Sequence, residues 1–104
     1  MHVMRLRNPW RSESPGHYRR RFGRPTNLDP GERVLLVFEQ LVEGAQIALN
    51  GQPLEGLVTD ITERLEANNE ITVRVRPQQA EAAGPQFVGH LVADVRLEIH
   101  SASD

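Results

Sequence analysis

The sequence contains no cysteine and no lysine, and no apolar run in it is long enough to cross a bilayer. Without cysteine the chain has no disulfide, no thiol nucleophile and no thiolate-bound zinc. A membrane-spanning helix needs about 20 apolar residues, and the segment after Met1 also lacks the apolar stretch of a signal peptide. The sequence therefore predicts a cytoplasmic protein with no membrane partner.

Catalytic and metal-binding motifs are missing as well. The sequence has no glycine-rich phosphate loop, no nucleophile elbow around a serine and no HExxH pair. Its four histidines, at His2, His17, His90 and His100, lack the spacing that brings metal ligands together. The sequence thus predicts no catalytic residue, no metal and no cofactor, and an enzyme is not expected.

The length of 104 residues and the apolar fraction of 38% suit one globular domain over residues 1–104, expected to stand alone from Met1. All 12 basic residues are arginine, and they are unevenly placed. Residues 1–24 hold seven arginines and one acid, a net charge of +6, whereas residues 25–104 hold five arginines and 13 acids, a net charge of −8. Such asymmetry marks either a nucleic-acid-binding arm or strands whose charges cancel in space.

Apolar and polar residues alternate in several short segments, a pattern typical of strands with one buried face. The expected strands are 2–7, 17–22, 45–49, 57–61, 71–75 and 95–99. Asn50-Gly51 predicts a tight hairpin, because both residues tolerate positive φ. Residues 8–16 contain two prolines and are expected to form a loop, and Thr62 can cap one helical turn within 62–66. The pattern predicts an all-β sandwich.

Residues 29–43 fit two alternatives. Asp29, Pro30 and Glu32 have the spacing of a helix start, and apolar residues over 34–42 recur at helical intervals. The unbroken apolar run Val34–Phe38, which follows a Pro-Gly turn, is instead typical of a buried central strand. The local signals slightly favour the helix.

Six motifs occur in order over residues 17–99. They are His17–Phe22 followed by Pro25, Arg33–Phe38, Ala45–Gly51, Asp60–Thr62 followed by Leu65, Asn69–Val75, and Val88–Leu97. Together they resemble the galactose-binding-like jelly-roll domain, as in the N-terminal sugar-binding domain of family 2 glycoside hydrolases of the β-galactosidase/β-glucuronidase type. The resemblance implies a jelly-roll β-sandwich of about eight strands, with a strand rather than a helix at Val34–Phe38.

The resemblance also implies a function. In the family's enzymes catalysis belongs to a separate barrel domain, for which 104 residues leave no room, so a non-catalytic accessory module with a carbohydrate ligand is implied. The candidate ligand-binding residues are Trp10, His17, Tyr18 and Arg19, expected in loops at one end of the sandwich. Trp10 offers an aromatic face to a sugar ring, and the alternative is that it folds back over the edge of the sandwich.

Two other functions compete with sugar binding. The first is a protein-interaction or assembly domain, which binds a protein partner or a second copy through a sheet face or an edge strand. The second is nucleic-acid contact through the arginine-rich N-terminus. It ranks lowest, because Arg19, Arg20 and Arg21 alternate between the two faces of a strand and nucleic-acid sites need contiguous charge.

The alternation also predicts which side chains form the core. Twelve are expected to be buried: Phe22, Leu36, Phe38, Ile47, Leu49, Ile61, Leu65, Ile71, Val73, Val75, Val95 and Leu97.

Overall fold

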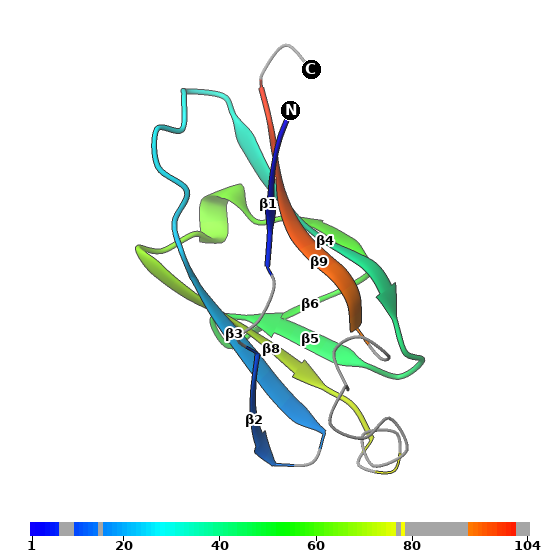
Figure 1. Cartoon of the computed structure of the whole chain (residues 1–104). Coiled ribbons are helices and arrows are strands. Elements are labelled where there is room, and N and C mark those ends of the chain that lie inside the picture. Colours follow the sequence, from blue (N-terminus) through cyan, green and yellow to red (C-terminus); the bar gives the residue numbers. More distant parts are fainter. Residues whose placement is uncertain (7–9, 15, 77, 79–91, 102–104) are drawn as a thin grey trace.

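The computed structural model describes residues 1–6, 10–14, 16–76, 78 and 92–101, which form two antiparallel β-sheets (Figure 1). The four-stranded sheet has the order β1-β9-β4-β7, with bounds His2–Arg5, Val92–His100, Arg33–Leu41 and Val58–Asp60. The five-stranded sheet has the order β2-β3-β8-β5-β6, with bounds Arg11–Ser14, His17–Gly23, Asn68–Arg74, Gln46–Leu49 and Gln52–Leu54. A 3₁₀ turn, η1 (Thr62–Arg64), lies between β7 and β8. The all-β prediction and the short helical turn are confirmed, with nine described strands where about eight were expected.

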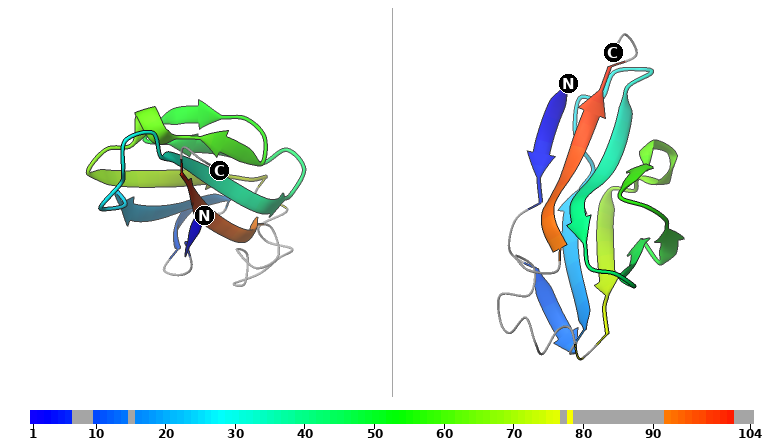
Figure 2. Two further views of the ribbon diagram at one scale, coloured as in Figure 1. Left: turned by 90° about the horizontal axis from the view of Figure 1, so that it is seen from above. Right: turned by 90° about the vertical axis from the view of Figure 1, so that its right-hand side faces the viewer.

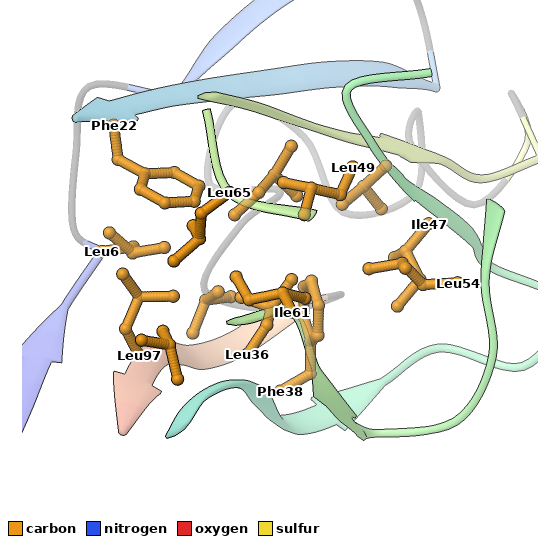
Figure 3. Packing of buried hydrophobic residues seen from close by; sticks show 14 of the residues in the cluster. Leu6, Phe22, Leu36, Phe38, Ile47, Leu49, Leu54, Ile61, Leu65 and Leu97 are labelled. Carbon is orange, nitrogen blue, oxygen red and sulfur yellow. The ribbon is translucent and has the colours of Figure 1, made fainter. Parts of the chain in front are cut away.

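The two sheets pack face to face around a shared hydrophobic core, and the side view in Figure 2 shows β1, β9 and β4 lying side by side in one layer. Figure 3 shows Phe22 and Leu49 of the five-stranded sheet on one side of the interior, with Leu36 and Leu97 of the four-stranded sheet on the other. Alternate residues of a strand point to opposite faces, so one side of each sheet supplies the core and the other faces outward. The two outward faces are the surfaces on which a site can form.

All twelve residues expected in the core are buried. Strand parity explains the success, since each of the alternating segments places its apolar residues on one side. Four further core residues were not expected: Leu6, Val34, Leu54 and Ile99. Val37 is buried too, on the outward face of the four-stranded sheet, where it pairs with Arg96 and Val58.

The ambiguous segment at 29–43 is a strand. β4 runs from Arg33 to Leu41 and pairs with β9 on one side and β7 on the other, which confirms the implication of the resemblance and overturns the helix favoured by local signals. Residues 29–32 form a turn instead of a helix start. Gly31 has a φ of 86°, and the backbone N–H of Asp29 donates to Glu32 Oε1 at 2.6 Å. The side-chain-to-backbone bond that would cap a helix therefore closes a turn, and the central position in the sheet decides for the strand.

The expected hairpin at Asn50-Gly51 is also confirmed. Both residues have positive φ, 51° and 83°, as a two-residue turn between β5 and β6 requires. The Asn50 side chain continues into the sheet: its Oδ1 accepts the Glu70 N–H at 2.8 Å, and its Nδ2 donates to Asn69 Oδ1 at 3.1 Å. Asn69 is 2% exposed and also bonds both backbone groups of Glu66. This side-chain network ties the hairpin to the start of β8.

Thr62 was expected to cap the helical turn, but it is the first residue of η1, whose N-cap is Ile61 and has no side-chain cap bond. Asp60 and Thr62 bond other backbone N–H groups. Asp60 Oδ1 accepts the Thr62 N–H at 3.0 Å, and Thr62 Oγ1 accepts the Val34 N–H at 2.8 Å. These bonds hold η1 against β4, beside the four-stranded sheet.

One expectation at the N-terminus was wrong. Residues 8–16 were expected to form a loop, but Arg11–Ser14 form β2, which pairs with residues 17–19 of β3 across a register shift between Ser12 and Ser14. The segment lacks apolar alternation, so it carries no local strand signal; pairing with β3 makes it an edge strand.

Candidate functional site

The outward face of the five-stranded sheet carries a depression. The register places His17, Arg74 and Gln46 in one row across β3, β8 and β5, and Arg19, Thr72 and Ala48 in the next. Pro53 of β6 extends the second row to the edge of the sheet. These side chains point away from the core because their neighbours along each strand point into it.

This outer-face depression has a volume of about 860 Å³. Its lining includes the small side chains of Ala48 and Thr72, and also Glu55 and Gly56 of the chain that leaves β6. A space of this size is typical of sites for small organic ligands. The lining residues are His17, Tyr18, Arg19, Ala45, Gln46, Ile47, Ala48, Gly51, Pro53, Leu54, Glu55, Gly56, Glu70, Thr72, Val73 and Arg74.

Polar groups of both hydrogen-bonding kinds surround the depression. Arg19 and Arg74 are donors, Glu55 and Glu70 are acceptors, and Gln46 is both. Glu70 Oε2 lies 3.8 Å from Arg19 Nη1. That arrangement suits a ligand rich in hydroxyl groups, because each hydroxyl donates one hydrogen bond and accepts others.

Three of the four predicted ligand-binding residues meet at this depression. His17, Tyr18 and Arg19 all line it, although it lies on a sheet face and not in the loops where the site was expected. Tyr18 also packs against the core.

Trp10 lies elsewhere. It is partly buried against the core, and its indole Nε1 donates to the Leu6 carbonyl at 3.3 Å. It is not among the described residues that line the depression. This placement matches the alternative in which Trp10 folds back over the edge of the sandwich, and a role for Trp10 in ligand binding stays a prediction.

Sequence reasoning missed the rest of the depression. Gln46, Ala48, Pro53, Thr72 and Arg74 come from three segments that meet only through strand pairing. None carries a local motif. The available signal was parity: in each expected strand, the residues that alternate with the core positions had to share an outward face.

The outward face of the four-stranded sheet has a different arrangement of charges. Arg96 lies between two carboxylates, 2.6 Å from Glu39 and 2.8 Å from Glu98, and His100 Nε2 lies 3.0 Å from Glu98. Arg33 pairs with Asp60 at 2.6 Å.

These contacts shift the acidity of the groups. Hydrogen bonds from Arg96, and then from His100, hold the pKa of Glu98 below its ordinary value, and hydrogen bonds to Glu39 and Glu98 raise the pKa of Arg96. A hydrogen bond from the Thr62 hydroxyl is the main cause that lowers the pKa of Asp60, with Arg33 adding to it.

Within the described ranges, no three histidine, aspartate or glutamate side chains gather into a group that could hold a metal ion. The same part of the chain has no helix with the length and apolar character needed to cross a bilayer.

A comparison of the sequence with models of known protein families finds no match, and a comparison with curated proteins finds none either. The likeness to the galactose-binding-like jelly-roll domain therefore stays a prediction from the six motifs.

Proposed function

We propose that this chain is a non-catalytic carbohydrate-binding module and that the sugar lies in the outer-face depression. The observation that supports this is the convergence of donors and acceptors from three adjacent strands around small side chains. Rigid strands position such groups more accurately than loops do. Arg19 and Gln46 donate to ring hydroxyls, Glu55 and Glu70 accept from them, and Ala48 with Pro53 offers apolar contact to the ring.

We further propose that the sandwich has jelly-roll topology. The chain passes from one sheet to the other after β1, β3, β4, β6, β7 and β8, and only β2–β3 and β5–β6 are consecutive neighbours within a sheet. Repeated crossing between two antiparallel sheets is the arrangement of Greek-key and jelly-roll sandwiches. The crossing pattern and the six motifs both support this proposal.

A glycan array followed by calorimetric titration of the best neutral oligosaccharide tests the function. Gln46→Ala removes one donor and one acceptor from the depression and is expected to weaken binding about three- to tenfold. Gln40→Ala, the matched control at an exposed position near the end of β4, is expected to leave affinity unchanged. If no glycan binds the wild-type chain at millimolar concentration, carbohydrate binding is the wrong function.

A second candidate function rests on the opposite sheet. β7 is an edge strand of three residues, and Leu57 and Val58 beside and within it are 44% and 57% exposed. An exposed apolar edge is a template for pairing with another strand. Antiparallel pairing of β7 with β7 of a second copy is self-complementary and yields a two-fold dimer. Light scattering then gives a dimer mass that falls to the monomer mass in Val58→Lys, whereas a monomeric wild type rules this candidate out.

A further inference from the structure

A second pocket, the arginine pocket, adjoins the depression and is lined by four arginines. Arg11 comes from β2, and Arg19, Arg20 and Arg21 come from β3; the volume is about 140 Å³. Arg19 lines both hollows, so the two share this one residue.

Strand pairing brings the four side chains together although strand parity separates them. The register places Arg11 opposite Arg19 on the outward face, and Arg21 follows Arg19 on the same face. β2 pairs with residues 17–19 of β3, and the Arg20 guanidinium folds toward the carbonyl of Arg21 just past this paired stretch. Along β3, Arg20 alternates with Arg19 and Arg21, as expected from the sequence. All four arginines nevertheless line the same pocket.

The described residues that line this pocket all carry cationic side chains. Four guanidinium groups line the pocket, and Glu70 serves two of them, at 3.2 Å from Arg21 Nε and 3.8 Å from Arg19 Nη1. Guanidinium groups repel one another, and they form bidentate hydrogen bonds with carboxylate and other oxyanions. At about 30 Å³ per water, 140 Å³ is the space of roughly five waters, which suits one sulfate or carboxylate group.

We infer that the ligand is an acidic glycan, whose sugar ring lies in the outer-face depression while a sulfate or carboxylate substituent binds in the arginine pocket. This inference rests on the proposed carbohydrate function and names its substrate class. Arg19, which lines both hollows, contacts the ring and the anionic group together.

A nucleic acid fits the site less well. Sites for single strands combine positive charge with exposed aromatic faces on which bases stack. Of the two aromatic rings among the described residues of the depression, Tyr18 packs against the core, which leaves the small His17 imidazole for stacking. Glu55 and Glu70 also line the depression, where they accept hydrogen bonds from sugar hydroxyls.

The test is calorimetric titration of the whole chain with four probes: a sulfated heparin oligosaccharide, an oligogalacturonate, a neutral galacto-oligosaccharide and a single-stranded oligonucleotide. At least one of the two acidic glycans is expected to bind tenfold or more tightly than the neutral one. Arg11→Gln and Arg21→Gln are each expected to weaken acidic-glycan binding about tenfold and to leave neutral-glycan binding unchanged. Arg64→Gln makes the same charge change on exposed η1 and is expected to alter neither.

The outcomes distinguish failure of the acidic-glycan inference from failure of the proposed carbohydrate function. Equal binding of neutral and acidic glycans overturns the acidic ligand and leaves carbohydrate binding standing. Failure of every glycan overturns both. Tighter binding of the oligonucleotide than of any glycan overturns both in favour of nucleic-acid contact, and an equal loss of affinity in Arg64→Gln reduces the effect to unspecific attraction between net charges.

Discussion

The outward faces of the two sheets are both rich in charge, but the charges are arranged differently. On the four-stranded sheet, Arg96 lies between Glu39 and Glu98, and Arg33 pairs with Asp60. On the five-stranded sheet Glu70 is shared between two arginines, beside a pocket lined by four. The first face resembles a set of structural ion pairs, and the second a surface prepared for an anionic ligand.

Because side chains alternate along each strand, each sheet has one core face and one outward face. The two outward faces can take different roles. The four-stranded face buries Val37 beneath its charges and is expected to contribute to stability. The five-stranded face has a depression lined with small side chains and is expected to contribute to binding. The division is wrong if substitutions on the five-stranded face change stability rather than binding, or if substitutions on the four-stranded face change binding rather than stability.

The largest expected effect lies beneath both faces. Phe38 is 1% exposed, and Phe38→Ala should lower the free energy of unfolding by roughly 3–5 kcal/mol. Because the two sheets share this core, stability and glycan binding should fall together. Urea denaturation measures the loss. Val58→Ala, an exposed position on the same sheet, should stay within about 0.5 kcal/mol of wild type. A cost below about 1 kcal/mol for Phe38→Ala would place this side chain outside the core.

Asn69 should give the next largest effect, because the five-stranded sheet also depends on a buried hydrogen-bond network. The side chain is 2% exposed and bonds Glu66 and Asn50. Asn69→Ala leaves several of these groups unsatisfied and should cost about 2–3 kcal/mol. Asn68→Ala, the exposed neighbour on β8, is the control and should cost less than about 0.5 kcal/mol. Equal denaturation midpoints for the two variants would contradict this account.

Trp10 sharpens the comparison at the edge of the sandwich. Since its ring packs against the core and its Nε1 bonds Leu6, Trp10→Ala should lower the thermal midpoint by several degrees. A loss of about 1 kcal/mol moves a domain of this size by roughly 4–8 °C. Glycan affinity measured well below the midpoint should stay unchanged. An unchanged midpoint with abolished binding would instead make Trp10 a ligand-binding residue, as the sequence first suggested.

Much of the fold could be predicted from the sequence, because alternating apolar and polar residues identify the strands and their buried faces. The parity of Ile71, Val73 and Val75 was enough to place them in the core, and Asn50-Gly51 was enough to place the hairpin. The strand over Val34–Phe38 could not be settled locally, because a short apolar run fits a helix or a central strand equally well. Only its two partners, β9 and β7, decide it.

The candidate site could be predicted only in part. His17, Tyr18 and Arg19 were found because they stand together in one segment. Ala48 and Thr72 were missed because nothing in their own segments marks them, and they become neighbours only through the register of β5 with β8. A site on a sheet face forms when distant segments pair as strands. The register of that pairing cannot be read from a single sequence.

The next prediction compares the same substitution at one arginine on each outward face. Arg19→Gln should weaken glycan binding about tenfold, with little change in the thermal midpoint, because its side chain borders both hollows. Arg96→Gln should lower the midpoint and leave glycan affinity unchanged, since it separates Glu39 and Glu98 from their shared cation. Calorimetric titration and thermal melts of both variants measure the two quantities. If each variant changes both quantities equally, the division between the faces is wrong.

The smallest expected effect is on acid stability, and it should come from the four-stranded face. The pKa values of Asp60 and Glu98 are held below their ordinary values of 3.8 and 4.5. A carboxyl whose pKa is lower in the folded chain binds its proton more readily when unfolded, so its contribution to stability is complete above the ordinary value. That contribution is lost as the pH falls through the lowered folded value. Urea midpoints should therefore be level from about pH 7 to 5 and should fall below about pH 4.5. Asp60→Asn should flatten part of that fall, whereas Glu63→Gln, an exposed carboxylate on η1, should leave its slope unchanged. If Asp60→Asn keeps the full slope, the bonds from Thr62 and Arg33 to Asp60 do not stabilise this face.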